Sequence, residues 1–432
     1  STSRLTLWAK LIRFEVENFL SIKEKVVFSM ESDKKDDNLK DSLIEIKEEN
    51  ILLSPLLAIY GNNATGKTNL LKAMSHLSFL IKTTQFMTIG QQIPRVPFKL
   101  IKDKPTNFTI VFIKNDIRYA YFISFNDTHI LKEALYHYPS KKQKKIFERT
   151  SEGDEIKTVY PREYNSKFKD MKDKTLTNKL FLGTLSEWVE IDEIKNVIDF
   201  FKNDLVINMN EGNPDWLQYT VEILKKKKEY RKIFLDILRK INPSIKDFEA
   251  KFEKIDTDKF PPGIPEELKL FLQKGDSFET KVNIFYYESN LIFNLEEESK
   301  GVRKFFEIGG PIINVLLNGK ILFYDELETS FHPTISKILI EIFQNKEINR
   351  RGAQLIFTTH DVNLLNLEIL RKDQIWFTEK GIKTNYSTKL TPLSQIRGVR
   401  KDENIRIKYL RGVYTDIQIL NSNSLITLCG EE

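Results

Sequence analysis

The segment that most constrains this chain is GNNATGKT, residues Gly61–Thr68, which fits the pattern G-x-x-x-x-G-K-[ST] at every fixed position. In such a loop the glycines let backbone N–H groups close around phosphates, and the following helix adds its positive N-terminal end. That geometry requires a buried strand before the loop, and the apolar residues 52–60 predict one. It also requires a helix after the loop, which is indicated by apolar residues at helical spacing: Leu70, Leu71, Met74, Leu77 and Leu80.

The loop therefore predicts a site for ATP and Mg²⁺. Lys67 would contact the phosphates as a cation, and the hydroxyl of Thr68 would bind Mg²⁺. The residues expected to surround the nucleotide are Gly61, Asn62, Asn63, Ala64, Thr65, Gly66, Lys67, Thr68 and Asn69. The alternative interpretation is an ordinary turn between a strand and a helix, which the match at every fixed position disfavours.

A second segment carries the acidic groups that hydrolysis needs. Ile321–Tyr324 is a short apolar strand, and Asp325 and Glu326 follow it directly. Carboxylates that follow a buried strand lie at the carboxyl edge of a sheet, where ligands bind in open α/β folds. We expect Asp325 to hold Mg²⁺ through water, and Glu326 to orient or deprotonate the attacking water. The alternative is a strand that leaves the core into a solvated loop.

Two weaker motifs gain meaning from their order along the chain. Ser299 and Gly301 precede a helical stretch at 302–317, where a hydroxyl, backbone N–H groups and a helix N-terminus could hold an anion. His360 follows an apolar strand at 355–357 and could contact the γ-phosphate, although a lone histidine more often has a structural role. The remaining histidines form no metal-binding spacing.

Composition bounds the class of protein. The chain has 432 residues, enough for two or three domains, and no apolar run approaches the ~18–20 residues of a membrane span. Cys429 is the single cysteine, so no intrachain disulfide can form, which is typical of a cytoplasmic protein. The 67 basic residues stand among 61 acidic ones, and the net charge of +6 permits contact with nucleic acid without requiring it.

The succession of patterns predicts an ATP-binding fold that is divided by an insertion. The N-terminal part contains two strands at 108–125, which a tight turn at Asn115-Asp116 would join. Residues 176–260 change to a helical period. The expected divisions are an extension at 1–10, an N-terminal lobe with the phosphate loop at 11–150, a helical insertion at 151–280, a C-terminal lobe at 281–395 and a tail at 396–432.

The order of the motifs resembles that of ABC-class ATPases rather than that of hexameric AAA+ motors. The stretches AIYGNNATGKTNLLKAM, EEESKGVRKFF, GKILFYDELETSFHP and GAQLIFTTHDVNLL are similar to an AAA/ABC-like family of ATP/GTP phosphatases. That family is related to the overcoming-lysogenization-defect (OLD) ATPases and to SMC-like heads. The resemblance implies an α/β ABC-class head, with a mixed central sheet, an antiparallel N-terminal sheet and a helical insertion domain.

The resemblance also implies how the site is completed. ABC-class heads form homodimers or larger assemblies that hold ATP between the phosphate loop of one copy and an S-x-G motif, the signature, of another. In this chain the signature would be Ser299 and Gly301, which would then act in trans, on ATP bound to another copy. By analogy with SMC-like heads, Asn18 near the first strand turn, together with Ser21, would approach the nucleotide.

Members of the resembled family stand in bacterial anti-phage cassettes of the AbiL, PARIS and Septu types, beside a separate nuclease. The resemblance thus implies an ATPase sensor that responds to a phage-derived trigger and controls a TOPRIM, RloB-like or HNH nuclease. OLD proteins carry a TOPRIM nuclease after the ATPase, but the residues after His360 hold no acidic cluster, so this chain should not be the nuclease. One alternative is an SMC-like DNA-acting ATPase in repair. A non-catalytic scaffold is disfavoured because Lys67, Asp325 and Glu326 are all present.

Overall fold

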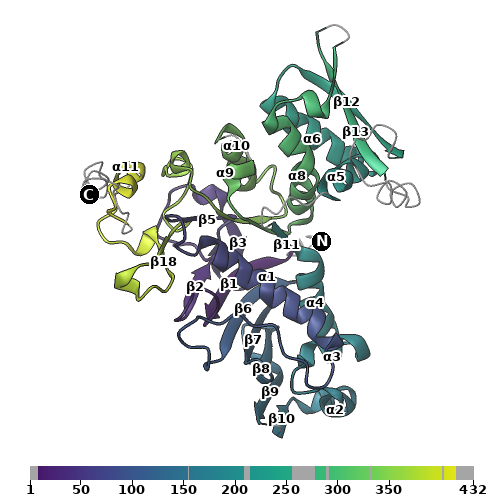
Figure 1. Cartoon of the computed structure of the whole chain (residues 1–432), viewed down its shortest axis with the longest axis vertical. Coiled ribbons are helices and arrows are strands. Elements are labelled where there is room, and N and C mark those ends of the chain that lie inside the picture. Colours follow the sequence, from purple (N-terminus) through teal and green to yellow (C-terminus); the bar gives the residue numbers. More distant parts are fainter. Residues whose placement is uncertain are drawn as a thin grey trace, which may run out of the picture. The chain divides into compact units, whose positions relative to one another are not determined.

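The computed structural model describes residues 8–153, 155–208, 215–254, 278–288, 291–330, 333–400 and 403–414. The chain divides into two compact units. The first consists of Ser1–Asn210, Val315–Glu328 and Lys337–Glu432, and the second of Glu211–Asn314 and Thr329–Ser336. Figure 1 labels many of their helices and strands, and each unit is described by itself.

In the first unit, the described residues form a mixed six-stranded sheet in the order β11-β15-β16-β5-β17-β18. Neighbouring strands are parallel except for the antiparallel pair β17 and β18. The strands β15, β16 and β5 are buried at every residue, as expected for apolar strands covered on both faces. The bounds are Leu205–Asn208 (β11), Ile321–Tyr324 (β15), Gln354–Thr358 (β16), Leu56–Tyr60 (β5), Ile375–Glu379 (β17) and Lys389–Pro392 (β18).

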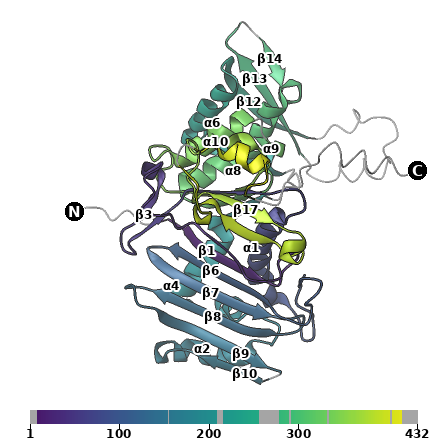
Figure 2. The ribbon, with the colours of Figure 1, turned by 90° about the vertical axis from the view of Figure 1, so that its left-hand side faces the viewer.

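A second sheet in this unit is antiparallel, and its seven described strands follow the order β10-β9-β8-β7-β6-β1-β2 (Figure 2). Asn115 and Asp116 join β6 to β7 with φ of 51° and 62°, the left-handed pair of a type I′ turn, so the predicted tight turn is confirmed. Phe28 of β2 meets Phe323 of β15 edge to face, with ring centroids 6.2 Å apart. The bounds are Lys10–Glu17 (β1), Val26–Ser29 (β2), Thr106–Lys114 (β6), Ile117–Phe125 (β7), Ile130–Tyr138 (β8), Lys144–Glu152 (β9) and Glu155–Val159 (β10).

The helix α1, Lys67–Thr83, follows the phosphate loop and contributes its apolar residues to the core that the two sheets share. Other helices are α2 (Asn165–Lys174), α3 (Phe181–Trp188), α4 (Asp192–Asp199), α9 (Leu327–Ser330), α10 (Pro333–Gln344) and α11 (Ile405–Leu410). Short 3-10 turns lie at Lys40–Ser42, Thr84–Phe86, Arg162–Tyr164, Val362–Leu364, Ile382–Thr384 and Leu393–Gln395, and a π turn at Phe200–Asp204. None of the helices in the described part of the chain has the length and apolar character needed to cross a membrane.

The second unit combines helices with a small antiparallel sheet. Its described strands pair in the order β12-β13-β14, and a short 3-10 turn connects β14 to α8. Phe234 of α6 stacks on Phe305 of α8, with ring centroids 4.8 Å apart. A Cβ on Gly310 would lie 2.6 Å from Thr220 of α5, so glycine permits this close helix packing. The bounds are Asp215–Lys226 (α5), Lys228–Ile241 (α6), Ile245–Lys254 (β12), Phe278–Tyr286 (β13), Ile292–Asn294 (β14), Leu295–Glu297 (a 3-10 turn) and Lys300–Asn318 (α8).

Several elements differ from the sequence-based predictions. The apolar run at 52–60 is two strands rather than one, because Ser54 and Pro55 separate β4 (Ile51–Leu53) from β5. The strand β3 (Ile44–Ile46), in the charged stretch at 32–50, pairs with β4. The predicted insertion at 151–280 coincides with neither compact unit, and the block at 176–260 contains β11 and β12 besides its helices.

The predicted ends of the fold also differ. Lys10, which falls in the expected extension, begins β1 and is buried. Within the expected tail, Tyr409 of α11 stacks on Phe377 of β17 with ring centroids 5.4 Å apart, so this part belongs to the packed first unit. About half of the predicted tail, residues 415–432, lies outside the described part of the chain.

Candidate nucleotide site

The phosphate loop connects the end of β5, at Tyr60, to the start of α1, at Lys67. Gly66 caps the helix with φ of 100°, a conformation that side chains with a Cβ rarely adopt. A Cβ on Gly66 would lie 2.1 Å from the hydroxyl of Thr388, and one on Gly61 would lie 2.0 Å from the hydroxyl of Thr378. Both glycines of the motif are therefore required by the packing beneath the loop as well as by any phosphates above it.

Hydroxyl groups from distant segments support the loop from beneath. Thr378 of β17 hydrogen-bonds the hydroxyl of Thr65 at 2.7 Å, and Thr388 donates to the backbone carbonyl of Thr65 at 2.8 Å. Ser21 lies 2.7 Å from the hydroxyl of Thr388 and accepts a hydrogen bond from the amide of Asn69 at 2.7 Å. Sequence reasoning missed Thr378 and Thr388, because only the parallel pairing of β17 with β5 brings that part of the chain to the loop.

The amine of Lys67 folds back onto the loop. It donates to the carbonyls of Gly61 at 2.8 Å and Asn62 at 3.1 Å, and the residue is only 6% exposed. Burial lowers the pKa of Lys67 to about 8, while the carboxylates of Glu328, Glu326 and Asp325 act in the opposite direction. The amine is thus still mainly protonated at neutral pH and carries the charge that a phosphate requires.

This lowered pKa predicts a pH dependence of ATP affinity. A bound phosphate raises the pKa of a neighbouring ammonium, so ATP binds the protonated form of Lys67, which predominates below pH 8 and is lost above it. We expect affinity for a fluorescent ATP analogue to fall by about tenfold between pH 7 and pH 9, as linkage to one proton requires. The control is Lys67→Ala, whose residual affinity should not follow this slope. An unchanged affinity of the wild type at pH 9 would contradict the prediction.

Asp325 is the centre of the polar contacts beside the loop. The carboxylate is buried, and the hydroxyl of Thr68 donates to it from 2.9 Å (Oδ2) and 3.1 Å (Oδ1). Thr358, at the end of β16, donates to Oδ1 at 2.6 Å. The structure thus brings together Thr68 and Asp325, which the sequence predicted as the Mg²⁺ ligands. Their oxygens suit this hard cation, which proteins bind through one or two such groups while phosphates and waters complete its coordination.

Glu326 and His360 lie at the neighbouring strand ends. Glu326 has φ of 50°, and its backbone N–H donates to the hydroxyl of Thr358 at 2.7 Å. The backbone N–H of His360 donates to Glu328 Oε1 at 2.6 Å. Burial lowers the pKa of the His360 imidazole, Lys67 lowers it further, and nearby carboxylates oppose the shift. The ring is therefore mainly neutral at physiological pH and can hydrogen-bond a phosphate or a water.

Ser299 and Gly301 lie in the second unit, at the start of α8. The Ser299 hydroxyl accepts the backbone N–H of Val302 at 3.3 Å, as a helix-capping group does. A Cβ on Gly301 would lie 3.1 Å from Ile335 Cδ1, so the helix is tightly packed at this turn. Their predicted action in trans would be a contact with ATP bound to the phosphate loop of a second copy of the chain.

Asn18 does not have the contacts expected of a nucleotide ligand. Its amide nitrogen donates to the carbonyls of Ile101, Lys104 and Pro105, and its oxygen accepts the backbone N–H of Phe98. The residue is 1% exposed. These contacts hold the loop at 98–105 against the end of β1 and correct the prediction for Asn18. Ser21, three residues later, contacts Asn69 and Thr388 beside the phosphate loop.

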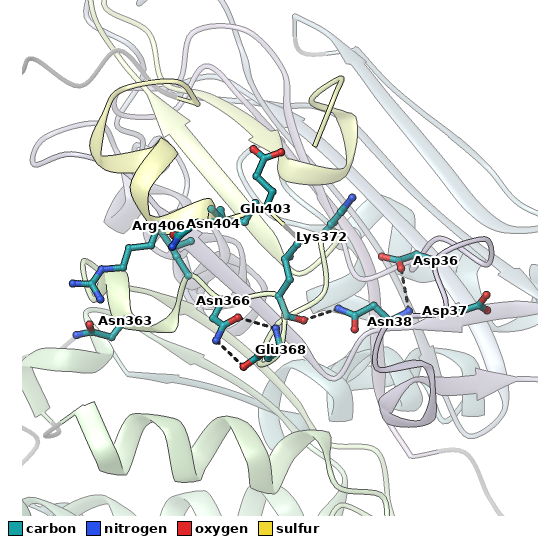
Figure 3. Close-up of a pocket in the computed structure, with 13 residues that line it drawn as sticks. Asp36, Asp37, Asn38, Asn363, Asn366, Glu368, Lys372, Glu403, Asn404 and Arg406 are labelled. Atoms are coloured by element: carbon teal, nitrogen blue, oxygen red, sulfur yellow. Dashed lines mark hydrogen bonds between the residues drawn. The ribbon is translucent and has the colours of Figure 1, made fainter. Parts of the chain in front are cut away.

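A polar cavity of about 620 Å³ lies in the first unit beside the segment that follows His360 (Figure 3). One wall is the loop at 36–38, where the amide of Asn38 donates to the carbonyl of Leu367. The buried guanidinium of Arg371 also binds the backbone of this loop. The cavity is lined by Asp36, Asp37, Asn38, Asn363, Leu365, Asn366, Leu367, Glu368, Lys372, Glu403, Asn404, Ile405 and Arg406. Its lining shares no residue with the phosphate loop or with Asp325 and Glu326, so it is a separate feature.

Within the described residues, no cluster of three His, Cys, Asp or Glu side chains forms a self-contained metal site. A cation at Asp325 would therefore depend on the nucleotide for further ligands. Thr68, Lys67 and Asp325 meet next to a loop shaped for phosphates, and this arrangement is suited to a metal–nucleotide complex rather than to a structural metal.

Comparison with known proteins found similar solved structures and a matching family. SMC heads are among the solved structures that resemble the chain. The "SmcHead bound to the C-winged helix domain of ScpA" is 11% identical with a TM-score of 0.42, covering 88% of this chain and 96% of that chain. The "SMC head domain from Thermotoga maritima" is 12% identical with a TM-score of 0.40, covering 89% and 98%. The head with an extended coiled coil bound to the C-terminal domain of ScpA, from Pyrococcus furiosus, is 11% identical with a TM-score of 0.38, covering 90% and 97%.

No curated protein matches the chain. A protein family does match it, over residues 56–180 and 188–366, which together make up more than half of its length. The matched residues include the phosphate loop, Ser299, the acidic strand end and His360. The chain therefore belongs to the ATPase family described as "AAA domain, putative AbiEii toxin, Type IV TA system".

Proposed function

We propose that this chain binds and hydrolyses Mg²⁺–ATP and works as a switch: ATP assembles copies of the chain, and hydrolysis resets them. The observation that carries the proposal is the hydrogen-bonded group of Thr68, Asp325 and Thr358 beside the phosphate loop. Three segments far apart in the sequence converge on one carboxylate, and they do so at the carboxyl edge of the parallel strands.

Each residue of the site has a chemical task in this proposal. The loop N–H groups and Lys67 would bind the β- and γ-phosphates, and Mg²⁺ held by Thr68 and Asp325 would neutralise charge that develops on the phosphates. Glu326 would orient and deprotonate the attacking water. Thr358 donates to Asp325 and accepts the Glu326 N–H, and it thereby fixes both acids relative to each other.

Assembly follows from the location of the signature. Ser299 and Gly301 offer an anion a hydroxyl and backbone N–H groups at the start of α8, a helix of 19 residues. In the proposed assembly these groups contact the γ-phosphate held by the phosphate loop of a second copy. ATP would then be the contact between copies, and loss of the γ-phosphate would release them.

We further propose that the switch controls a separate effector in bacterial anti-phage defence, a nuclease of the TOPRIM, RloB-like or HNH type. The toxin–antitoxin system named in the description of the family supports this proposal. In such a system a harmful activity is held in check until a trigger releases it. An ATP-dependent assembly provides a means of holding and release, because the partner can bind one oligomeric state in preference to the other.

The test combines the mass of the assembly with control of the effector. In analytical ultracentrifugation the purified chain should gain mass with Mg²⁺ and a non-hydrolysable ATP analogue, and should not with ADP or with EDTA. A chain that binds the analogue without gaining mass would refute the assembly switch. Cells that express the chain with a nuclease encoded beside it should degrade nucleic acid on infection. Cells with Lys67→Ala in place of the wild type should lose that response, and an unchanged response would refute control by ATP.

A further inference from the structure

A chain of hydrogen bonds in the second unit leads from the small sheet to the start of α8. Tyr286, the last residue of β13, donates its hydroxyl to Glu298 Oε1 at 2.5 Å. The same hydroxyl accepts a hydrogen bond from the amide of Asn242, the residue that caps the end of α6, at 3.2 Å. Glu298 Oε2 in turn accepts the backbone N–H of Ser299 at 3.4 Å. The ends of α6 and β13 are thus connected to the signature serine.

The backbone of Ser299 determines the direction of its hydroxyl. The Ser299 carbonyl accepts the N–H of Arg303 at 3.0 Å, and its hydroxyl oxygen accepts the N–H of Val302 at 3.3 Å. One lone pair of the hydroxyl oxygen therefore accepts a hydrogen bond from the helix. The hydroxyl proton can be donated to an anion. Any rotation of the peptide between Glu298 and Ser299 would change the direction of the Ser299 O–H bond.

Glu298 is an unusual neighbour for an anion site. It is only 9% exposed, and burial of a carboxylate is costly unless hydrogen bonds stabilise its charge. The hydroxyl of Tyr286 and the N–H of Ser299 provide that stabilisation. Burial, reinforced by Glu298, raises the pKa of Tyr286 to about 12, so its hydroxyl stays a donor throughout the physiological range.

The turn that precedes Glu298 is itself fixed. The backbone N–H of Asn294, at the end of β14, donates to the Glu297 carboxylate at 2.7 Å, which forms part of a capping box. The ring of Phe293 packs edge to face on Tyr286 with ring centroids 5.3 Å apart. A shift of β13 along its neighbours would therefore be transmitted to Glu298 through a short and ordered segment.

We propose that Tyr286 and Glu298 are positioning residues for Ser299, and that through them the β12–β14 sheet sets how well the signature engages ATP in another copy of the chain. This inference rests on the proposed ATP-driven assembly. It adds the contact through which a displacement of β13 would weaken the signature, because such a displacement breaks the Tyr286–Glu298 bond.

The test begins with Tyr286→Phe, which removes the hydroxyl and keeps the ring. Because the phosphate loop is untouched, this variant should bind a fluorescent ATP analogue with the affinity of the wild type. Its ATP-driven assembly and its rate of hydrolysis should each fall by about tenfold, the effect of losing one hydrogen bond to a buried charged group. The matched control is Tyr287→Phe at the adjacent position, where the side chain is 59% exposed and should not matter.

A mixing experiment separates a positioning role from simple destabilisation. In a mixture of Tyr286→Phe with Lys67→Ala, a mixed assembly combines the intact phosphate loop of one variant with the intact signature of the other. The hydrolysis rate of the mixture should therefore exceed the sum of the rates of the two variants alone. If Tyr286→Phe fails to fold, Glu298→Gln tests the next contact of the same chain of hydrogen bonds: it keeps an acceptor for the Tyr286 hydroxyl but replaces the acceptor of the Ser299 N–H by an amide group.

The outcomes distinguish the inference from the function on which it rests. Wild-type assembly and hydrolysis by both Tyr286→Phe and Glu298→Gln would overturn the inference, and so would a slow Tyr286→Phe that Lys67→Ala does not rescue. Neither result would affect ATP binding and assembly by the wild type. If the wild type itself does not assemble with ATP, the proposed function fails first. Reduced assembly together with rescue in the mixture supports the inference.

Discussion

Replacement of Glu326 by glutamine is expected to slow ATP hydrolysis by at least about 100-fold while leaving ATP bound, because general base catalysis typically contributes 10²–10⁴-fold. Glutamine keeps the size of the side chain and can still orient a water, but it cannot accept its proton. The Glu326 N–H would still donate to the hydroxyl of Thr358, so the strand end should keep its shape. Bound ATP that is not hydrolysed should also trap the assembled form.

The measurement is steady-state release of phosphate, combined with ultracentrifugation in ATP. The matched control is Glu341→Gln on α10, where the carboxylate is 62% exposed and its partner, Lys337, lies 4.0 Å away at the surface. This control should hydrolyse ATP at the rate of the wild type. A Glu326→Gln protein that turns over as fast as the control would remove Glu326 from the role of base. The search for that base would then move to Glu328, which holds the backbone of His360.

Replacement of Lys67 by alanine is expected to weaken ATP binding by about 100-fold or more. The amine is the one cation of the phosphate-loop motif, and a hydrogen bond between charged groups contributes about 1.5–3 kcal/mol, with tenfold in affinity for each 1.4 kcal/mol. Lys67 would make more than one such contact with the phosphates. The variant should also lose the carbonyl contacts to Gly61 and Asn62, which leaves the loop less well ordered before ATP arrives.

Isothermal titration with an ATP analogue measures this effect directly. The matched control is Lys72→Ala, which removes an exposed lysine five positions further along the same helix and should bind as the wild type does. Thermal unfolding of both variants shows whether a loss of binding reflects a loss of fold. Affinity within a factor of two of the wild type for a folded Lys67→Ala protein would mean that the phosphates bind elsewhere.

The parts of the site that the sequence predicted are those whose chemistry is local. The polar groups of Gly61–Thr68 follow directly after one apolar strand, and Asp325 and Glu326 follow directly after another. Pattern and periodicity were therefore sufficient to find both segments. The tight turn at Asn115-Asp116 was predicted for the same reason, since its left-handed conformations depend on these two residues alone.

The parts that were missed depend on which strands become neighbours. Thr378 and Thr388 contact Thr65 only because β17 lies beside β5, and nothing in their own segments marks them as supports of a phosphate loop. Asn18 was placed by analogy near the nucleotide, but its amide is used by the backbone at 98–105. In the block at 176–260, the predicted helical period holds in α6 but does not hold over β12, which is a strand.

The hydrogen bond that Thr388 donates to the carbonyl of Thr65 has a consequence for biosynthesis. β5 emerges early from the ribosome, whereas β15, β16, β17 and the residues next to β18 are made hundreds of residues later. Pairings of such large sequence separation form late in folding. The loop therefore cannot reach its final shape while the chain is still attached and incomplete. A nascent chain should consequently neither capture ATP nor recruit a finished copy before β15 to β18 have been synthesised.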